Sequence, residues 1–199
     1  MTLKEDIVRE SMKLFSLKGY AGTGVNEIIE TVGSSKGGFY NHFASKEELF
    51  YEVLAEAQRI WRNRVLHGLN EIESPVEKII KLLENYRDRY LKDGDNFPGG
   101  CIFVTFSVEL DHQHPQLIQE VNNGFVGLKN MLGKLLEEGK ILGELNNEVD
   151  TGMISEMLFA GMLGASVVFG VEKSPTALNK TIQSLIEYIN KLRQPISGG

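Results

Sequence analysis

The side chains with the most reactive chemistry lie near the middle of the sequence. Cys101 follows two glycines at the expected start of a helix, where the helix dipole lowers the pKa of a thiol and favours the thiolate. A cysteine enzyme would also need a base, and His112 and His114 are the candidates. The same segment suggests a metal site, because Glu109 and His112 are three positions apart on one helical face.

Simpler explanations compete with both kinds of chemistry. Pro115 moves the preceding His114 out of the helix, and polar residues at 109–114 are equally typical of a helix end. The sequence contains no recognisable catalytic triad, phosphate-binding loop or cofactor fingerprint. We therefore predict that the protein is not an enzyme and holds neither a metal ion nor a cofactor. Cys101 is then either a small residue at a tight helix contact, which we favour, or a reactive thiol.

Helices are expected throughout the chain. Its 199 residues are 42% hydrophobic and 24% charged, which suits a globular protein with one sizeable core or two small ones. Apolar residues recur with helical spacing and not with strand alternation, which predicts an all-α fold. Helices are expected from Thr2 to Gly19, over 25–32, from Ser34 or Ser35, over 45–65, from Ser74, and over 101–112, 116–140, 150–169 and 175–192.

The first three of these helices are short and predict a helix-turn-helix unit. Residues 32–35 form the tight, glycine-containing connection that such a unit requires. In this arrangement the third helix enters the major groove of DNA, with its N-terminal residues nearest the bases. Gly37 and Gly38 lie at that end, where absent side chains let the backbone approach phosphates or base edges. Phe39 and Phe43 are expected to face the core.

Polar residues are expected on the outer face of the third helix. Tyr40 and His42, with Lys46 just beyond, suit phosphate oxygens, and Lys36 could reach a guanine edge or a phosphate. Bulk charge does not assist, because the net charge is −6 and residues 1–48 carry six basic against seven acidic side chains. Attraction to DNA must therefore come from a local face.

The segment around the third helix resembles the signature of the TetR family of transcriptional regulators. The matching residues are Gly19-Tyr20, Thr23-Gly24-Val25, Glu27-Ile28 and the run from Ser35 to Leu49. The resemblance implies a dimeric, ligand-responsive repressor, with a DNA-binding domain at 1–46 and a helical effector-binding and dimerisation domain at 47–199. An activator of the same fold is the alternative. Because members often carry a polar residue where this chain has Gly38, readout is expected to depend on Lys36, Asn41, Asn26 and DNA shape.

Candidate residues follow for each function. The residues expected to contact the DNA operator are Thr23, Asn26, Ser35, Lys36, Gly37, Gly38, Tyr40, Asn41, His42 and Lys46. Those expected around a small-molecule effector are Trp61, Phe97, Cys101, Phe103, Phe106 and Glu109, although aromatic residues at helical spacing are also typical of a plain core. The resemblance adds that a few relatives use a cysteine near this position to sense electrophiles.

The last two expected helices suit a homodimer. Small residues in one and an apolar stripe down the other would let two copies pair as a four-helix bundle, as the resemblance implies, although such a stripe could also pack within its own subunit. The residues expected at this interface are Gly161, Gly164, Ile182, Leu185, Ile186 and Ile189. A two-fold dimer implies a palindromic operator. A single cysteine, an apolar stretch too short to span a bilayer and a polar N-terminal segment predict a cytoplasmic protein without a membrane partner.

Overall fold

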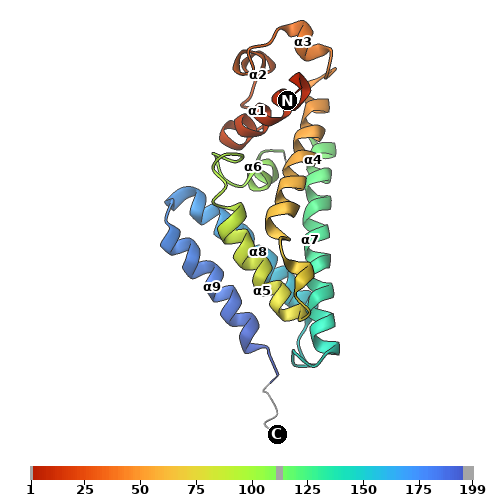
Figure 1. Ribbon diagram of the computed structural model, residues 1–199, viewed down its shortest axis with the longest axis vertical. Coiled ribbons are helices and arrows are strands. Elements are labelled where there is room, and N and C mark those ends of the chain that lie inside the picture. Colours follow the sequence, from red (N-terminus) through yellow and green to blue (C-terminus); the bar gives the residue numbers. More distant parts are fainter. Residues whose placement is uncertain (1, 111–113, 195–199) are drawn as a thin grey trace. The chain divides into compact units, whose positions relative to one another are not determined.

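The computed structural model of the chain describes residues 2–110 and 114–194 and is helical along most of that length. Figure 1 shows the order of the elements. They are α1 (Leu3–Lys18), α2 (Val25–Thr31), α3 (Lys36–Tyr40), α4 (Lys46–Val65), the 3-10 turn η1 (Leu69–Glu71), α5 (Pro75–Asn85), the π-helix η2 (Tyr86–Tyr90), α6 (Ile102–Glu109), α7 (Pro115–Ile141), α8 (Thr151–Glu172) and α9 (Pro175–Lys191). The expected all-α fold is confirmed.

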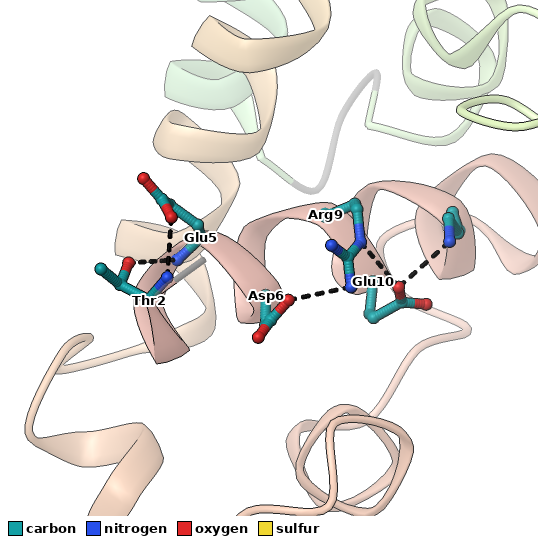
Figure 2. A network of polar contacts seen from close by, with 6 residues as sticks. Thr2, Glu5, Asp6, Arg9 and Glu10 are labelled. Carbon is teal, nitrogen blue, oxygen red and sulfur yellow. Dashed lines mark hydrogen bonds and ion pairs between the residues drawn. The ribbon is translucent and has the colours of Figure 1, made fainter.

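Helix starts follow the capping signals in the sequence. Thr2 Oγ1 accepts a hydrogen bond from Glu5 N at 3.3 Å, and Glu5 Oε2 accepts one from Thr2 N at 2.7 Å, so the capping box at the start of α1 is complete (Figure 2). Ser74 caps α5, with Pro75 in its first turn. The helix expected over 101–112 is shorter, because α6 ends at Glu109.

The chain forms two compact units. The first contains residues up to Trp61 together with the segment 93–123, and the second contains 62–92 and the residues from Gly124 onward. These units differ from the expected division at residue 46, because part of the expected effector domain packs with the N-terminal helices. In the first unit, α1, α2 and α3 pack against one another, and α6 packs against α1 (Figure 1).

An aromatic cluster forms the centre of the first unit. The centre of the Phe106 ring in α6 lies 4.7 Å from the centre of the Phe50 ring in α4 and 6.1 Å from the centre of the Phe15 ring in α1. Tyr20, which follows α1, meets Phe15 at 5.7 Å and Phe50 at 5.4 Å. These edge-on and tilted pairs bury large apolar areas and fix α6 against α1 and α4.

The second unit is organised around α8 and α9, which pack side by side. The inward side chains of α9 are Leu178, Ile182, Ile186 and Ile189, and all four are buried within the same chain. Next to them α5 continues into the π-helix, where the Tyr86 and Tyr90 rings stack at 5.6 Å. The Tyr86 hydroxyl bonds Ser166 Oγ and donates to Met162 O at 3.1 Å. The sequence pattern did not predict this π-helix.

Candidate nucleic-acid interface

The helix-turn-helix expected from the sequence is present in the first unit. Gly33 adopts a left-handed φ of 65°, which a glycine accepts without strain, and so reverses the chain after α2. Ser35 then caps α3, accepting a hydrogen bond from Gly38 N at 3.0 Å. Ile28 and Phe39 are both fully buried and hold the two helices on a shared apolar core.

The side chains around α3 divide as predicted. Phe39 and Phe43 are buried, with relative exposures of 0% and 1%, whereas Tyr40 is 54% exposed. The structure brings the following predicted DNA-contact residues to the exposed surface of α2, α3 and the residues next to α3: Asn26, Ser35, Lys36, Gly37, Tyr40, Asn41 and His42. This surface, which we call the α3 face, offers hydroxyl, amide, imidazole and ammonium groups that suit phosphates and base edges.

Ion pairing leaves Lys36 as the available cation on this face. Lys4 pairs with Glu52, Lys18 pairs with Glu27, and Arg9 and Lys13 pair with acids along α1 (Figure 2). Among the lysines and arginines of residues 2–48, all of which the structure describes, Lys36 is the one without an ion pair or hydrogen bond. An unpaired lysine at the exposed start of α3 can bind an anion without first breaking an internal contact.

Thr23 and Lys46 are placed differently from the expectation. Thr23 is fully buried, and its Oγ1 donates a hydrogen bond to Gly19 O at 2.7 Å. Its side chain is therefore not accessible to DNA, and the prediction that Thr23 contacts the operator through its side chain is wrong. Lys46 is half-buried, and its Nζ donates to Tyr20 O at 2.9 Å and to Thr23 O at 3.1 Å. Burial lowers the pKa of Lys46, and attraction to Glu109 opposes that effect. A phosphate contact by Lys46 stays a prediction.

The two glycines of α3 have different surroundings. A Cβ on Gly38 would lie 2.5 Å from Ser34 Oγ and 3.4 Å from Leu3 Cδ2, so this position faces the protein. A Cβ on Gly37 would have Ser35 Oγ as its nearest neighbour, at 3.8 Å. A close approach of DNA at Gly38 stays a prediction, but a methyl group there would point toward Ser34 and Leu3 and not toward solvent. Gly37 is the glycine on the exposed side.

Three of the six residues proposed for the effector pocket are buried or hydrogen-bonded within the first unit. Phe106 belongs to the aromatic cluster, and Phe97 is buried with 4% exposure. Glu109 accepts hydrogen bonds from Tyr20 N and Ala21 N, both at 2.6 Å, and so has a role in the fold that the sequence did not indicate. The remaining three, Trp61, Cys101 and Phe103, are half-buried.

Two hollows in the second unit involve none of these residues. One, of about 640 Å³, is lined by polar and charged side chains of η2 and α9 and by Lys92. The other, of about 340 Å³, lies near the start of α8 and the end of α9. Both have a mixed lining, whereas sites for small organic ligands are mostly apolar. The effector site proposed at Trp61, Phe97, Cys101, Phe103, Phe106 and Glu109 stays a prediction.

The structure describes only part of the segment proposed for the alternative chemistry around Cys101. Cys101 is the N-cap residue of α6, as expected. Asp111, His112 and Gln113 lie outside the described residues, so the proposed metal and base functions of that segment have no structural description. Within residues 2–110 and 114–194, no group of three metal-ligating side chains occurs. His114 packs its ring 5.2 Å from that of Tyr20.

The apolar stripe on α9 was assigned to the wrong partner. Ile182 and Ile189 are fully buried and Ile186 is 6% exposed within the single chain, so these residues pack on their own subunit and not on a second copy. A Cβ on Gly161 would lie 2.7 Å from Leu185 Cδ2, which makes this glycine a close contact between α8 and α9 of one chain. Gly164 remains exposed, as an interface residue must be.

A different stripe lies on the outside of α8, and of its members only Gly164 was predicted at the interface. Its members alternate by four and three positions, which is the spacing of a helix-pairing seam, and they combine apolar with small side chains. They are Met153, Met157, Ala160, Gly164, Val167 and Val171. Met153 is 70% exposed and Val171 is 81% exposed. The spacing is visible in the sequence, but the more apolar α9 stripe obscured it.

Helix α8 is also apolar enough to be considered as a membrane-spanning helix. In the described part of the chain, α8 is the one helix whose length and composition would allow it to cross a membrane, and a third of its most apolar window is buried inside the protein. Core helices of soluble proteins meet this criterion too. The exposed stripe is also what a helical dimer interface requires.

Comparison with known proteins identifies the two parts of the chain. Residues 7–53 match the family of bacterial regulatory proteins called tetR, and residues 75–185 match the tetracyclin repressor-like C-terminal domain. The HTH-type transcriptional repressor DhaR of Mycobacterium sp. (strain GP1) is 25% identical over 195 residues, which cover 98% of this chain and 96% of DhaR.

Solved structures share the fold. A TetR transcriptional regulator from Chloroflexus aurantiacus is 29% identical, with a TM-score of 0.89 over 96% of each chain. AibR, crystallised with isovaleryl coenzyme A and operator DNA, is 16% identical, with a TM-score of 0.73 over 94% of this chain and 97% of its own. The helix-turn-helix, the exposed α3 face and the matches to both domains agree: the chain belongs to the TetR family of bacterial transcriptional regulators.

Proposed function

We propose that this TetR-family regulator is a cytoplasmic homodimer that represses transcription at a palindromic operator and leaves it when a small molecule binds. The observation that carries DNA binding is the α3 face, where Lys36 stands unpaired beside Gly37 and near the exposed Tyr40. Repression is supported by DhaR, a named repressor that aligns with almost the whole chain. Binding of a small molecule is supported by AibR, a protein of the same fold whose structure holds an acyl coenzyme A together with operator DNA; release of this chain from DNA is the part of the proposal that rests on the resemblance alone.

Dimerisation is supported by the outer stripe of α8. A second copy packed on this stripe would cover Met153, Val167 and Val171, which are 70%, 49% and 81% exposed in the single chain. Gly164 lies within the stripe and has no atom within 4 Å of a built Cβ, so a partner helix could approach closely there. A two-fold pair presents two α3 faces to DNA, and their symmetry requires two inverted half-sites.

Selection of bound duplexes from a random pool tests the DNA-binding part. We expect enrichment of one palindrome whose half-sites are about one helical turn apart. A pool that shows no enrichment, or enrichment of a sequence without two-fold symmetry, contradicts the dimeric operator model. The direction of regulation is tested by placing the selected site over a reporter promoter and deleting the gene for this chain. If the protein is a repressor, the deletion raises reporter expression; if it is an activator, the deletion lowers it.

A further inference from the structure

The connection between α1 and α2 is held by a charged side chain from far along the sequence. Glu109, the last residue of α6, accepts hydrogen bonds from Tyr20 N and Ala21 N, both at 2.6 Å, across 89 and 88 positions of sequence. Each carboxylate oxygen takes one amide. Hydrogen bonds to a charged acceptor are about twice as strong as neutral ones, so this pair fixes the turn firmly.

A second charge holds the same turn through its carbonyl groups. Lys46, the first residue of α4, donates to Tyr20 O and Thr23 O. Its Nζ also lies 4.2 Å from the centre of the Tyr20 ring. Tyr20 therefore gives its amide to an anion and its carbonyl to a cation, and the two side chains that hold it come from different helices.

Two glycines permit this close packing. Gly19 has a left-handed φ of 76°, and a Cβ there would overlap the Glu109 carboxylate. At the other end of α6, a Cβ on Gly99 would overlap Ser16 O, and Gly99 N donates to Ser16 Oγ at 3.2 Å. With Phe106 packed on Phe15 between these points, the segment from Gly99 to Glu109 contacts the end of α1 and the residues that follow it at three places.

We propose that Glu109 is a positioning residue for operator recognition: its carboxylate sets the turn from which α2 starts, and so fixes the orientation in which α2 and α3 meet DNA. The role rests on the proposed operator binding. Glu109 touches no part of the α3 face directly. Phosphate contacts tolerate small rotations of the recognition helix, whereas hydrogen bonds to base edges need a fixed orientation. Loss of the carboxylate therefore harms specific binding more than non-specific binding.

The test is Glu109→Gln, measured against the selected operator and against a scrambled duplex at a temperature where the variant is fully folded. The substitution keeps the size of the side chain but replaces one acceptor oxygen by an NH₂ group that faces a backbone amide. We expect operator affinity to fall about tenfold, the factor that one charge-assisted hydrogen bond supplies. Affinity for the scrambled duplex is expected to change much less.

Glu144→Gln is the matched control. Glu144 also holds a distant helix start, accepting from Ser74 Oγ at 2.6 Å and from Val76 N at 3.1 Å, but it lies in the second unit. We expect it to lower thermal stability and leave operator affinity unchanged. Unchanged operator affinity in Glu109→Gln, or an equal loss in both variants or on both duplexes, overturns the positioning role.

Amide exchange of the wild-type protein provides a measurement that needs no variant. We expect Tyr20 and Ala21 to exchange as slowly as amides inside α1, although Ala21 lies on the surface. Exchange at the rate of an open loop overturns the proposal. Failure of the wild-type protein to prefer any duplex refutes the proposed function and this role together, whereas operator binding that survives Glu109→Gln refutes the role alone.

Discussion

Substitution of the two adjacent glycines of α3 should separate folding from DNA binding. Gly37→Ala places a methyl group on the exposed side, where the nearest atom would be 3.8 Å away. Alanine at a compatible position stabilises a protein by about 0.4–1 kcal/mol through the unfolded state. We therefore expect Gly37→Ala to melt at or above the wild-type temperature. Its operator affinity should nevertheless fall, because the methyl group stands where the backbone approaches DNA.

Gly38→Ala should show the opposite balance. Its Cβ would meet Ser34 Oγ at 2.5 Å, and forcing an extra methyl into occupied space costs about 1–3 kcal/mol. After the gain from alanine is subtracted, the net loss of stability is about 0–2.6 kcal/mol. Removing the opposing hydroxyl with Ser34→Ala should recover most of this loss, so the double variant should be more stable than the sum of the single effects predicts.

Urea denaturation and operator titration on the same preparations measure both quantities. The four proteins needed for the cycle are wild type, Gly38→Ala, Ser34→Ala and the double variant, with Gly37→Ala as the comparison. Equal stability of the two glycine variants, together with additive effects of Ser34→Ala and Gly38→Ala, would refute the assignment of inner and outer glycines. Full operator affinity in Gly37→Ala would show that its position does not approach DNA.

Three further predictions concern other parts of the chain. Val171→Glu places a charge on the exposed α8 stripe, so we expect light scattering to show folded monomers. Ile186→Glu places a charge in the core, so we expect it to unfold the second unit, and folded monomers of Ile186→Glu would contradict this. Lys46→Ala should lower the melting temperature because it removes two hydrogen bonds to carbonyl groups of the α1–α2 connection, and an unchanged melting temperature would argue against that contact. Two cationic neighbours lower the pKa of Asp88 from 3.8 to about 2, so its ionised form stabilises the fold above pH 4 and this contribution disappears as the pH falls to 2. The difference in melting temperature between wild type and Asp88→Asn should shrink over that window, and a constant difference would contradict the pairing.

Local signals in the sequence predicted the helix-turn-helix well. Capping residues such as Thr2 and Ser35 act within three or four positions, so their patterns are visible without a structure. The four-residue spacing of Phe39 and Phe43 likewise indicated the buried side of α3. The polar side chains that we propose to contact DNA occupy the remaining, exposed face, so most of the α3 face followed from the same pattern.

Long-range contacts and the choice of packing partner were not predictable. The hydrogen bonds of Glu109 to Tyr20 and Ala21 join residues almost ninety positions apart, so no local pattern indicated them. The sequence suggested only a place for Glu109 in a ligand pocket. The stripe on α9 that includes Ile186 indicated burial, but spacing does not say whether the covering helix belongs to the same chain. The π-helix at Tyr86–Tyr90 adds one residue to a helical turn, and no residue type marks that change.

Salt-dependent binding of Lys36→Ala to the selected operator tests the central claim most directly. Lys36 is exposed and unpaired, so its removal should weaken operator binding and reduce the slope of log affinity against log salt by about one. Lys129→Ala removes the same charge from the second unit, where Lys129 pairs with Glu156, and should leave both quantities unchanged. Wild-type affinity and slope in Lys36→Ala would contradict the conclusion that the α3 face binds DNA.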